Sequence, residues 1–326
     1  MTQLITVLGA SGFVGSAVTR ALARQPIRLR AVSRRKLEPP PGQAETTVVA
    51  ADLTDRAALA EVVAGSDAIV YLLLADGGWR AAETEEAERV NLGVMRDLVD
   101  VAGAAGGKPP LVIYGGAASQ VGVPPREPLD GSETDAPATP YDKQKLAAED
   151  VLKKATAEGR VRGISLRLPT VFGENPAEGA NHDRGVVSAM ARRALDGHDL
   201  TIWGDGTVRR DLVHVEDIAA AFTAALAGPD PLVGGHWLLG AGRGDQLADV
   251  FRLVAKEMAE HTGRGPVDVT CVAPPSHAPE TDLRSVTIDS TPFRAITGWR
   301  PEISLPEGVR RTVAALTTPV HGKART

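Results

Sequence analysis

Tyr141 and Lys145 have the side chains and the spacing of a pair that could hand a proton to a carbonyl group. They bound the segment Tyr141-Asp-Lys-Gln-Lys145, and residues four apart on a helix lie on one face, one turn from each other. A phenol with a pKa of about 10 is a poor acid or base at neutral pH, so an adjacent ammonium group is needed to stabilise the phenolate. We therefore predict acid–base chemistry at a carbonyl.

A glycine-rich segment, Gly9-Ala-Ser-Gly12-Phe-Val-Gly15, has the spacing of a dinucleotide-binding turn. It follows an apolar run at 4–8 and precedes a helical pattern, which is the context that makes this motif informative. Gly9 allows a tight turn, Gly12 lets the backbone approach a pyrophosphate, and Gly15 lets helix and strand pack closely. The alternative is a glycine-rich turn without a ligand. The residues expected to contact the cofactor are Gly9, Ser11, Gly12, Phe13, Val14 and Gly15.

The residues after the next two predicted strands indicate which dinucleotide is bound. Enzymes that use NAD often place a carboxylate after the second strand, whereas this chain has Ser33, Arg34 and Arg35 there. Two guanidinium groups and a hydroxyl attract a 2′-phosphate, so NADPH, the reduced form of NADP, is favoured. The alternative is a solvated basic turn. Asp52 and Leu53, after the third strand, are expected to contact the adenine.

The elements that must position these residues are predicted to form a parallel sheet. Short β-branched runs alternate with helical patterns as far as residue 141, which is the signature of βαβ units. Strands are predicted at 4–8, 28–32, 46–49, 67–74, 111–114 and 163–168, and helices at 56–63, 83–105, 141–153, 187–195, 215–227, 247–261 and 307–316. The run 69–74 is apolar throughout, which is typical of a strand buried on both faces. Its end, formed by Leu72, Leu73 and Leu74, is expected to border the cofactor.

The fold class that follows is α/β, with a Rossmann-like doubly wound parallel sheet and a smaller C-terminal lobe. Residues 1–172 are expected to form the dinucleotide-binding domain, to which segments near 200–240 return. Residues 173–316 should form mainly the substrate-binding lobe, and 317–326 a loose tail.

Composition and charge exclude several other classes of function. The chain has 326 residues and a net charge of -5, which gives no field to attract nucleic acid or anionic lipid. No segment approaches the roughly 20 uninterrupted apolar residues of a membrane span. Cys271 is the only cysteine, which excludes an intrachain disulfide and predicts a cytoplasmic setting. No histidines and carboxylates have metal-ligand spacing, so no metal is expected.

The glycine motif and the Tyr141–Lys145 pair together resemble the extended short-chain dehydrogenase/reductase family over nearly the whole chain. Segments at 167–173, 200–206, 209–217 and 297–301 resemble motifs of its nucleotide-sugar branch. The resemblance implies that Leu168 and Thr170 contact the cofactor, and that Thr170 replaces the usual Asn at the sugar diphosphate. It further implies that Trp203 stacks on the nucleobase and that Arg210 binds the diphosphate.

Within this branch, the chain is most similar to the 4-ketoreductases that finish dTDP-deoxysugars for antibiotic glycosylation. The residues that carry this resemblance are Trp79 and Arg80, Arg184 with Val187, and the stretch 116–122. The partner implied is a dTDP-4-keto-6-deoxysugar. The 4,6-dehydratases need an Asp-Glu pair where this chain has Ala118 and Ser119, so dehydration is disfavoured. The 4-epimerases retain a tightly held NAD, whereas Arg34 and Arg35 imply a consumed NADPH.

Ala117 departs from the family pattern. The family places Ser or Thr at this position, five residues before the glycine that corresponds to Gly122, and its hydroxyl holds the substrate carbonyl oxygen. Either Ser119 takes over that contact, or Tyr141 acts without it, or catalysis has been lost and the protein senses NADPH or a sugar nucleotide. The family also often forms homodimers through two helices, which here would be those at 83–105 and after Tyr141.

Overall fold

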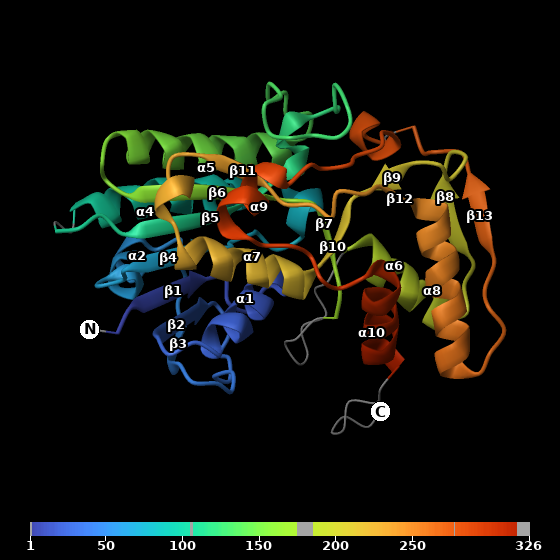
Figure 1. Cartoon of the computed structure of the whole chain (residues 1–326), viewed down its shortest axis with the longest axis horizontal. Helices are drawn as coiled ribbons and strands as arrows, with labels where there is room; N and C mark the ends of the chain where they lie inside the picture. The colour runs from blue at the N-terminus through green and yellow to red at the C-terminus, as the bar shows by residue number, and fades with distance from the viewer. Residues whose placement is uncertain (1, 105–106, 175–184, 277, 318–326) are drawn as a thin grey trace.

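A seven-stranded parallel sheet is the centre of the computed structural model, which describes residues 2–104, 107–174, 185–276 and 278–317. The strand order is β11-β6-β5-β4-β1-β2-β3 (Figure 1). Its strands are β1 (Leu4–Leu8), β2 (Arg28–Ser33), β3 (Glu45–Ala50), β4 (Ala68–Tyr71), β5 (Leu111–Ala117), β6 (Arg162–Leu168) and β11 (His236–Leu238). The chain runs outward from β1 through β2 to β3 and then returns to β4 on the other side. This reversal is the switch point at which doubly wound sheets bind ligands.

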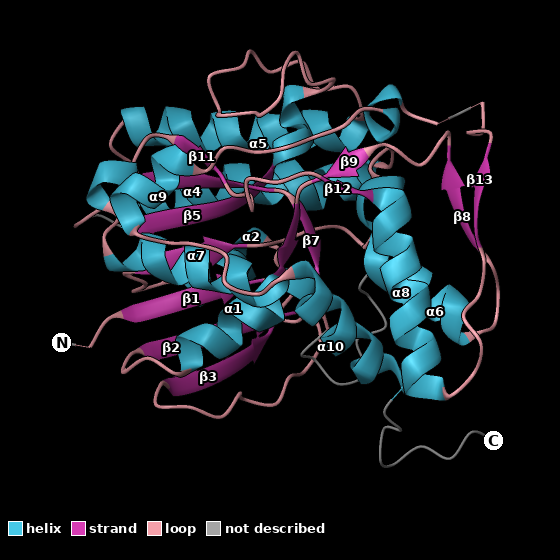
Figure 2. Ribbon diagram, turned by 45° about the vertical axis from the view of Figure 1, so that its right-hand side comes forward, coloured by secondary structure: helices cyan, strands magenta, loops and turns pink. Residues whose placement is uncertain are grey.

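Helices cover both faces of the sheet (Figure 2). Alternate residues of each buried strand point to opposite sides, so each strand packs against helices on both faces. Val7 packs with α1 (Phe13–Ala23) and α7 (Val215–Ala227) on one face. Its neighbour Leu8 packs on the other face with α2 (Arg56–Val63), α4 (Val94–Ala104) and α5 (Pro140–Ala157). The segment 215–238 therefore supplies both a covering helix and an edge strand to the sheet, although it lies late in the chain.

A second apolar cluster lies beside the sheet, at the right of Figure 1. It is built from α6 (Val186–Leu195), α8 (Leu247–Thr262), α10 (Leu305–Thr317) and the parallel pair of β8 (Leu200–Trp203) and β13 (Val269–Val272). Two short strand pairs lie between the sheet and this cluster. They join β7 (Thr170–Phe172) to β10 (Leu212–His214), and β9 (Arg209–Arg210) to β12 (Asp245–Gln246). The helix α9 (Thr291–Thr297) lies between β13 and α10 in the chain.

Two predicted elements differ from those observed. The strand expected at 67–74 ends at Tyr71, because the chain leaves the sheet there and turns through Gly77 and Gly78, both with positive φ, into the 3₁₀ helix η1 (Gly78–Ala81). The helix expected at 83–105 consists of α3 (Glu85–Glu88), a single π-helical stretch η2 (Arg89–Gly93) and α4. Such π-turns often occur at functional sites.

Candidate active site

The glycine-rich turn joins β1 to α1 in a geometry that requires glycine at Gly9 and Gly15. Gly9 has φ of 89°, and a Cβ there would lie 2.7 Å from the Leu72 carbonyl oxygen. A Cβ on Gly15 would lie 2.0 Å from the Gly9 oxygen, so this glycine lets the helix approach the turn. A Cβ on Gly12, the residue before α1, would meet only the Gly9 oxygen, at 3.2 Å. The turn therefore presents open backbone at a helix N-terminus, which suits a dinucleotide pyrophosphate.

The carboxyl end of β2 carries the residues expected to choose the dinucleotide. Ser33 is buried and its hydroxyl donates to the Arg35 carbonyl, while Arg34 forms an ion pair with Asp76, with 2.7 Å between Nη2 and Oδ1. Asp52, after β3, is exposed and accepts hydrogen bonds from Thr54 N at 3.0 Å and Thr54 Oγ1 at 2.8 Å. These bonds lower the pKa of Asp52. The Asp52 carboxylate thus lies in reach of a ligand at this edge of the sheet.

The helix α5, which carries the candidate catalytic pair, begins where its local sequence predicts. Thr139 is the N-cap and accepts from Asp142 N at 3.2 Å, while Asp142 Oδ2 accepts from Thr139 Oγ1 at 2.6 Å. Pro140 occupies the first turn, where its missing N–H is no loss. This reciprocal cap starts the helix just before Tyr141, which places Tyr141 at the carboxyl edge of the sheet.

Tyr141 and Lys145 lie together, as their spacing predicts. Lys145 Nζ is 5.8 Å from the centre of the Tyr141 ring and 5.0 Å from that of Tyr114, and it donates to the Gly115 carbonyl at 2.8 Å. Burial lowers the pKa of Lys145 to about 8. Burial also raises the pKa of the Tyr141 phenol, and the nearby Asp142 charge raises it further. At neutral pH Tyr141 is therefore protonated, which is the form that can donate a proton to a carbonyl oxygen.

Ala117 occupies the position at which the sequence predicts a missing catalytic hydroxyl. Ala117 ends β5, and its side chain carries no donor. Ser119, on the following 3₁₀ helix η3 (Ala118–Val121), is exposed and donates its hydroxyl proton to Asp142 Oδ1 at 2.5 Å. Ser119 can therefore donate to a substrate only by giving up its bond to Asp142.

Gln120 is a site-proximal residue that the sequence analysis did not single out. Its side chain is fully buried; Oε1 accepts from Ala117 N at 2.8 Å, and Nε2 donates to Glu149 Oε2 at 3.1 Å. A Cβ on Gly116 would lie 2.8 Å from this Oε1, so Gly116 makes room for it. The pairing joins the end of β5 to the catalytic helix one turn after Lys145.

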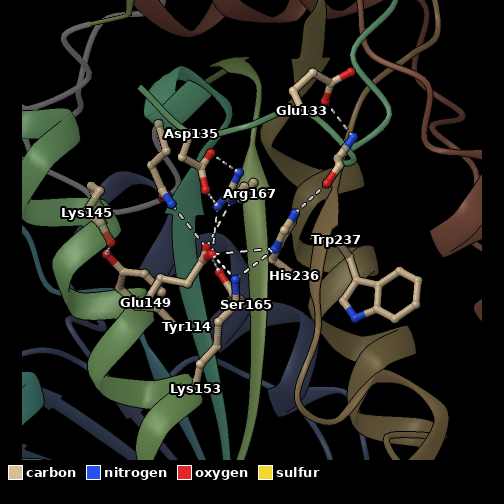
Figure 3. A network of polar contacts seen from close by, with 12 residues as sticks. Tyr114, Glu133, Asp135, Lys145, Glu149, Lys153, Ser165, Arg167, His236 and Trp237 are labelled. Atoms are coloured by element: carbon tan, nitrogen blue, oxygen red, sulfur yellow. Dashed lines mark hydrogen bonds and ion pairs between the residues drawn. The ribbon is translucent and has the colours of Figure 1, made fainter. Parts of the chain in front are cut away.

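Glu149, on α5, is the centre of a buried polar network between this helix and the sheet (Figure 3). Its carboxylate accepts from Arg167 at 2.7 and 3.0 Å, from Lys153 at 2.6 Å and from Ser165 at 2.6 Å. Burial alone would raise the pKa of Glu149, but the hydrogen bonds and charge of Arg167 and the hydrogen bonds of Lys153 and Ser165 lower it to about 2. The sequence signal that could have found part of this network is the spacing of four residues between Glu149 and Lys153, which form an ion pair on one face of α5.

The same network reaches a loop and an edge strand. Arg167 makes a bidentate pair with Asp135, with both distances 2.7 Å. Lys153 Nζ lies 2.9 Å from His236 Nδ1, and His236 Nε2 lies 2.8 Å from the Gly131 carbonyl oxygen. Because that carbonyl can only accept, Nε2 carries the proton and Nδ1 accepts from Lys153. The network thereby ties α5 to the 131–135 loop and to β11.

The residues expected to meet the sugar nucleotide are spread over both parts of the molecule. Thr170 begins β7 and its backbone N donates to the Asp211 carbonyl at 3.2 Å. Trp203 is 36% exposed at the end of β8, next to Val272 of β13, so an apolar face is available there. Arg210 donates to the backbone carbonyls of residues 281, 282 and 284. Its guanidinium therefore holds that segment in this structure.

Other predicted contacts differ in how accessible they are. Val187 is fully buried in the second apolar cluster, so its side chain presents no surface to a ligand. Leu72 and Leu73 are half-buried, and Leu74 is 43% exposed just beyond β4. Trp79 and Arg80 lie on η1, but their side chains are outside the described part of the structure, as is all of Arg184.

Residues of two segments that resemble family motifs, 209–217 and 297–301, contact each other and not the candidate site. Asp217, on α7, accepts from the backbone N of Glu302 and Ile303 at 3.0 and 3.1 Å. The Trp299 indole donates to the Asp217 carbonyl at 2.8 Å. These bonds fasten the chain before α10 against α7, so Trp299 and Asp217 stabilise the fold.

Two features are absent from the part of the chain that the structure describes. No described helix is both long and apolar enough to cross a membrane. Within the same residues, no group of three or more His, Cys, Asp or Glu side chains lies close enough together to hold a metal ion.

The fold and the glycine turn define a protein of the dinucleotide-binding α/β class, with its site at the carboxyl edge of a doubly wound sheet. The family model "NAD dependent epimerase/dehydratase family" matches residues 5–240, and the chain belongs to this family. Both the fold class and the resemblance to extended short-chain dehydrogenases/reductases are thereby confirmed.

Individual relatives resemble the chain over nearly its full length. A dTDP-6-deoxy-L-talose 4-dehydrogenase (NAD(P)(+)) of Kitasatospora kifunensis is 29% identical, with 96% of each chain covered. A dTDP-L-rhamnose 4-epimerase of Burkholderia thailandensis is 23% identical, with 94% of this chain and 92% of the relative covered. Among solved structures, MoeE5 in complex with UDP-glucuronic acid and NAD is 25% identical, with a TM-score of 0.79 over 96% of this chain and 98% of that one.

Proposed function

We propose that this protein is an NADPH-dependent reductase of the keto group, at C4, of a dTDP-4-keto-6-deoxysugar, acting in natural-product deoxysugar biosynthesis. The observation that carries the proposal is the protonated Tyr141 beside Lys145 at the carboxyl edge of the sheet, next to a glycine turn built for a dinucleotide. The full-length relative that acts as a dTDP-6-deoxysugar 4-dehydrogenase supports the substrate class and the carbon.

The cofactor would be held by residues that fit its parts. The turn from Gly9 to Gly15 suits the pyrophosphate, and Arg34 and Arg35 suit a 2′-phosphate. Asp52 and the Leu72–Leu74 segment would border the adenosine, and Leu168 and Thr170 the nicotinamide end. When bound, NADPH supplies the hydride for reduction of a carbonyl.

The protein's own residues manage the proton. Tyr141 Oη gives its proton to the carbonyl oxygen as the C–O double bond becomes a single bond to a new carbinol. The phenolate that remains is stabilised by the Lys145 ammonium group, whose place is set by the Gly115 carbonyl. Solvent then returns a proton to Tyr141. Because Ser119 donates to Asp142, Tyr141 acts without a second hydrogen bond from Ser119 in the unmodified chain.

Two other functions are kept as alternatives. Epimerisation at C4 is favoured by the full-length relative that acts as a dTDP-L-rhamnose 4-epimerase. A sensor of NADPH or sugar nucleotide, without turnover, is favoured by the missing hydroxyl at Ala117. An epimerase regenerates its cofactor in each cycle, whereas a reductase consumes one NADPH per product.

The test is incubation with NADPH and a set of dTDP-4-keto-6-deoxysugars, followed by absorbance at the NADPH band and by mass spectrometry and NMR of the sugar. Stoichiometric NADPH loss with a new carbinol at C4 is the expected result. In a parallel incubation with NAD and dTDP-6-deoxysugars that carry a hydroxyl at C4, interconversion of the two C4 epimers without net reduction of NAD would identify the epimerase. Binding of NADPH and dTDP without any conversion would identify the sensor.

A further inference from the structure

An ion pair joins the ends of two strands across the candidate cofactor site. Arg34 follows β2 and Asp76 follows β4, with 2.7 Å between the Arg34 Nη2 and Asp76 Oδ1 atoms. β1 lies between these two strands in the sheet. The pair therefore spans the end of β1, where the Gly9–Gly12 turn presents its open backbone.

Asp76 is held in this place by buried neighbours. The preceding residue, Ala75, donates its backbone N–H to Asn91 Oδ1 at 2.9 Å, and Asn91 lies in the π-helical stretch η2. After Asp76 the chain turns sharply: Gly77 has φ of 89°, and Gly78 N donates to the Ala75 carbonyl at 3.0 Å. The Asp76 carboxylate is thus aimed at Arg34 by a fixed turn, although both side chains are half or more exposed.

A second carboxylate also faces Arg34. The charge of Arg34 contributes, after the Thr54 hydrogen bonds, to the lowered pKa of Asp52 beyond β3. Arg34 therefore has two acidic neighbours, Asp52 beyond β3 and Asp76 beyond β4. A guanidinium group binds carboxylate and phosphate oxygens through the same planar fork, so the two compete for it.

We propose that Asp76 is a specificity-determining residue, whose carboxylate competes with the 2′-phosphate of NADPH for Arg34 and so limits the preference for NADPH over NADH. This inference rests on the proposed use of NADPH. Asp76 also repels the phosphate directly, whereas NADH, with a 2′-hydroxyl, does not need Arg34. Asp76 thus weakens the binding of NADPH and has no matching effect on the binding of NADH.

The experiment measures dissociation constants for NADPH and NADH, without any sugar substrate, by quenching of tryptophan fluorescence. The variants are Asp76→Asn, Arg34→Ala and the two combined. The matched control is Glu45→Gln, which breaks an exposed ion pair with Arg28 at the opposite end of the strands and changes the net charge equally.

Asp76→Asn should tighten NADPH binding about two- to fivefold at low salt, the range that an exposed ion pair can account for. NADH binding and the Glu45→Gln variant should stay unchanged, and the gain should shrink at high salt. In the Arg34→Ala background, Asp76→Asn should have much less effect. Weaker or unchanged NADPH binding in Asp76→Asn, or an equal gain without Arg34, overturns the role of Asp76.

The proposed NADPH preference can fail separately from this inference. Equal NADPH and NADH affinities in both the unmodified chain and Arg34→Ala would contradict the preference itself, and with it the competition. A clear preference that does not respond to Asp76→Asn would contradict only the role of Asp76.

Discussion

Ser119 donates its hydroxyl proton to Asp142, the residue directly after the candidate catalytic Tyr141, with 2.5 Å between Ser119 Oγ and Asp142 Oδ1. Asp142 is buried and also accepts from Thr139 through its other oxygen, Oδ2. A carboxylate can only accept, so the Ser119 proton must point toward it. Ser119, the hydroxyl that could replace the missing donor at Ala117, is therefore engaged elsewhere in this structure.

Asp142→Asn should raise kcat for ketosugar reduction, on the order of tenfold, which is below the effect of a full oxyanion donor. An amide has one acceptor oxygen to share between Ser119 and Thr139, so the hold on Ser119 weakens. The negative charge that raises the Tyr141 pKa is removed as well. Steady-state kinetics on Asp142→Asn, with and without Ser119→Ala, provide the measurement. If Ser119→Ala leaves the gain intact, the gain does not come from the released hydroxyl.

Ala117→Ser should increase kcat by up to about 10²–10³-fold, the effect of supplying one missing donor in such a site. The reason is that Ser119 is bonded to Asp142 in the unmodified chain, which leaves the position at the end of β5 without a side-chain donor. Turnover should be compared at saturating NADPH and ketosugar. An unchanged rate would mean that another group already provides the contact.

Tyr141→Phe should abolish reduction while leaving NADPH affinity nearly intact, because the ring still packs and only the transferable proton is lost. Tyr71→Phe is the matched control. It removes a buried phenol that donates to the Val90 carbonyl. Retention of more than a few per cent of kcat in Tyr141→Phe would require a different proton donor.

The rate of reduction should fall as the pH rises through about 8. Burial lowers the pKa of Lys145 to about 8, so its ammonium form is present below that pH and is lost above it. Without the ammonium group the Tyr141 phenolate is no longer stabilised. The pH profile of kcat/KM reports this ionisation in the free enzyme. A profile that stays level up to the ordinary lysine pKa of about 10.4 would contradict the assignment.

Glu149→Gln should destabilise the fold by about 3–5 kcal/mol, the loss typical of breaking a buried charge pair. Because the pKa of Glu149 is held at about 2, below its ordinary 4.5, its stabilising effect is present above pH 4.5 and disappears as the pH falls toward 2. Urea unfolding at neutral and acidic pH measures this difference. Glu158→Gln, which removes a surface pair with Arg160, is the control and should change stability little. Equal effects of both variants at neutral pH would contradict the role of the buried network.

Much of the fold could be predicted because local rules decide it. The first turn could be predicted from its glycines, because it needs a positive φ at Gly9 and a close approach of Gly15 to the Gly9 oxygen. The start of α5 follows from Thr139 and Pro140, whose effect lies within one helical turn. The alternating and continuous apolar runs predicted a parallel sheet and six of its seven strands, although the fourth strand is shorter than its apolar run and β11 was not predicted.

The pairings between side chains of different elements could not be predicted, because they depend on which strands lie next to each other. Arg34 meets Asp76 only because β2 and β4 flank β1, and Gln120 meets Glu149 only because η3 ends against the face of α5. The bond from Ser119 to Asp142 has the same origin. The sequence by itself determined the candidate proton donor and the cofactor turn, since both rest on backbone conformation and spacing within one element. The tertiary structure decided which charges and hydroxyls these groups must compete with, since such contacts form only after distant segments have packed.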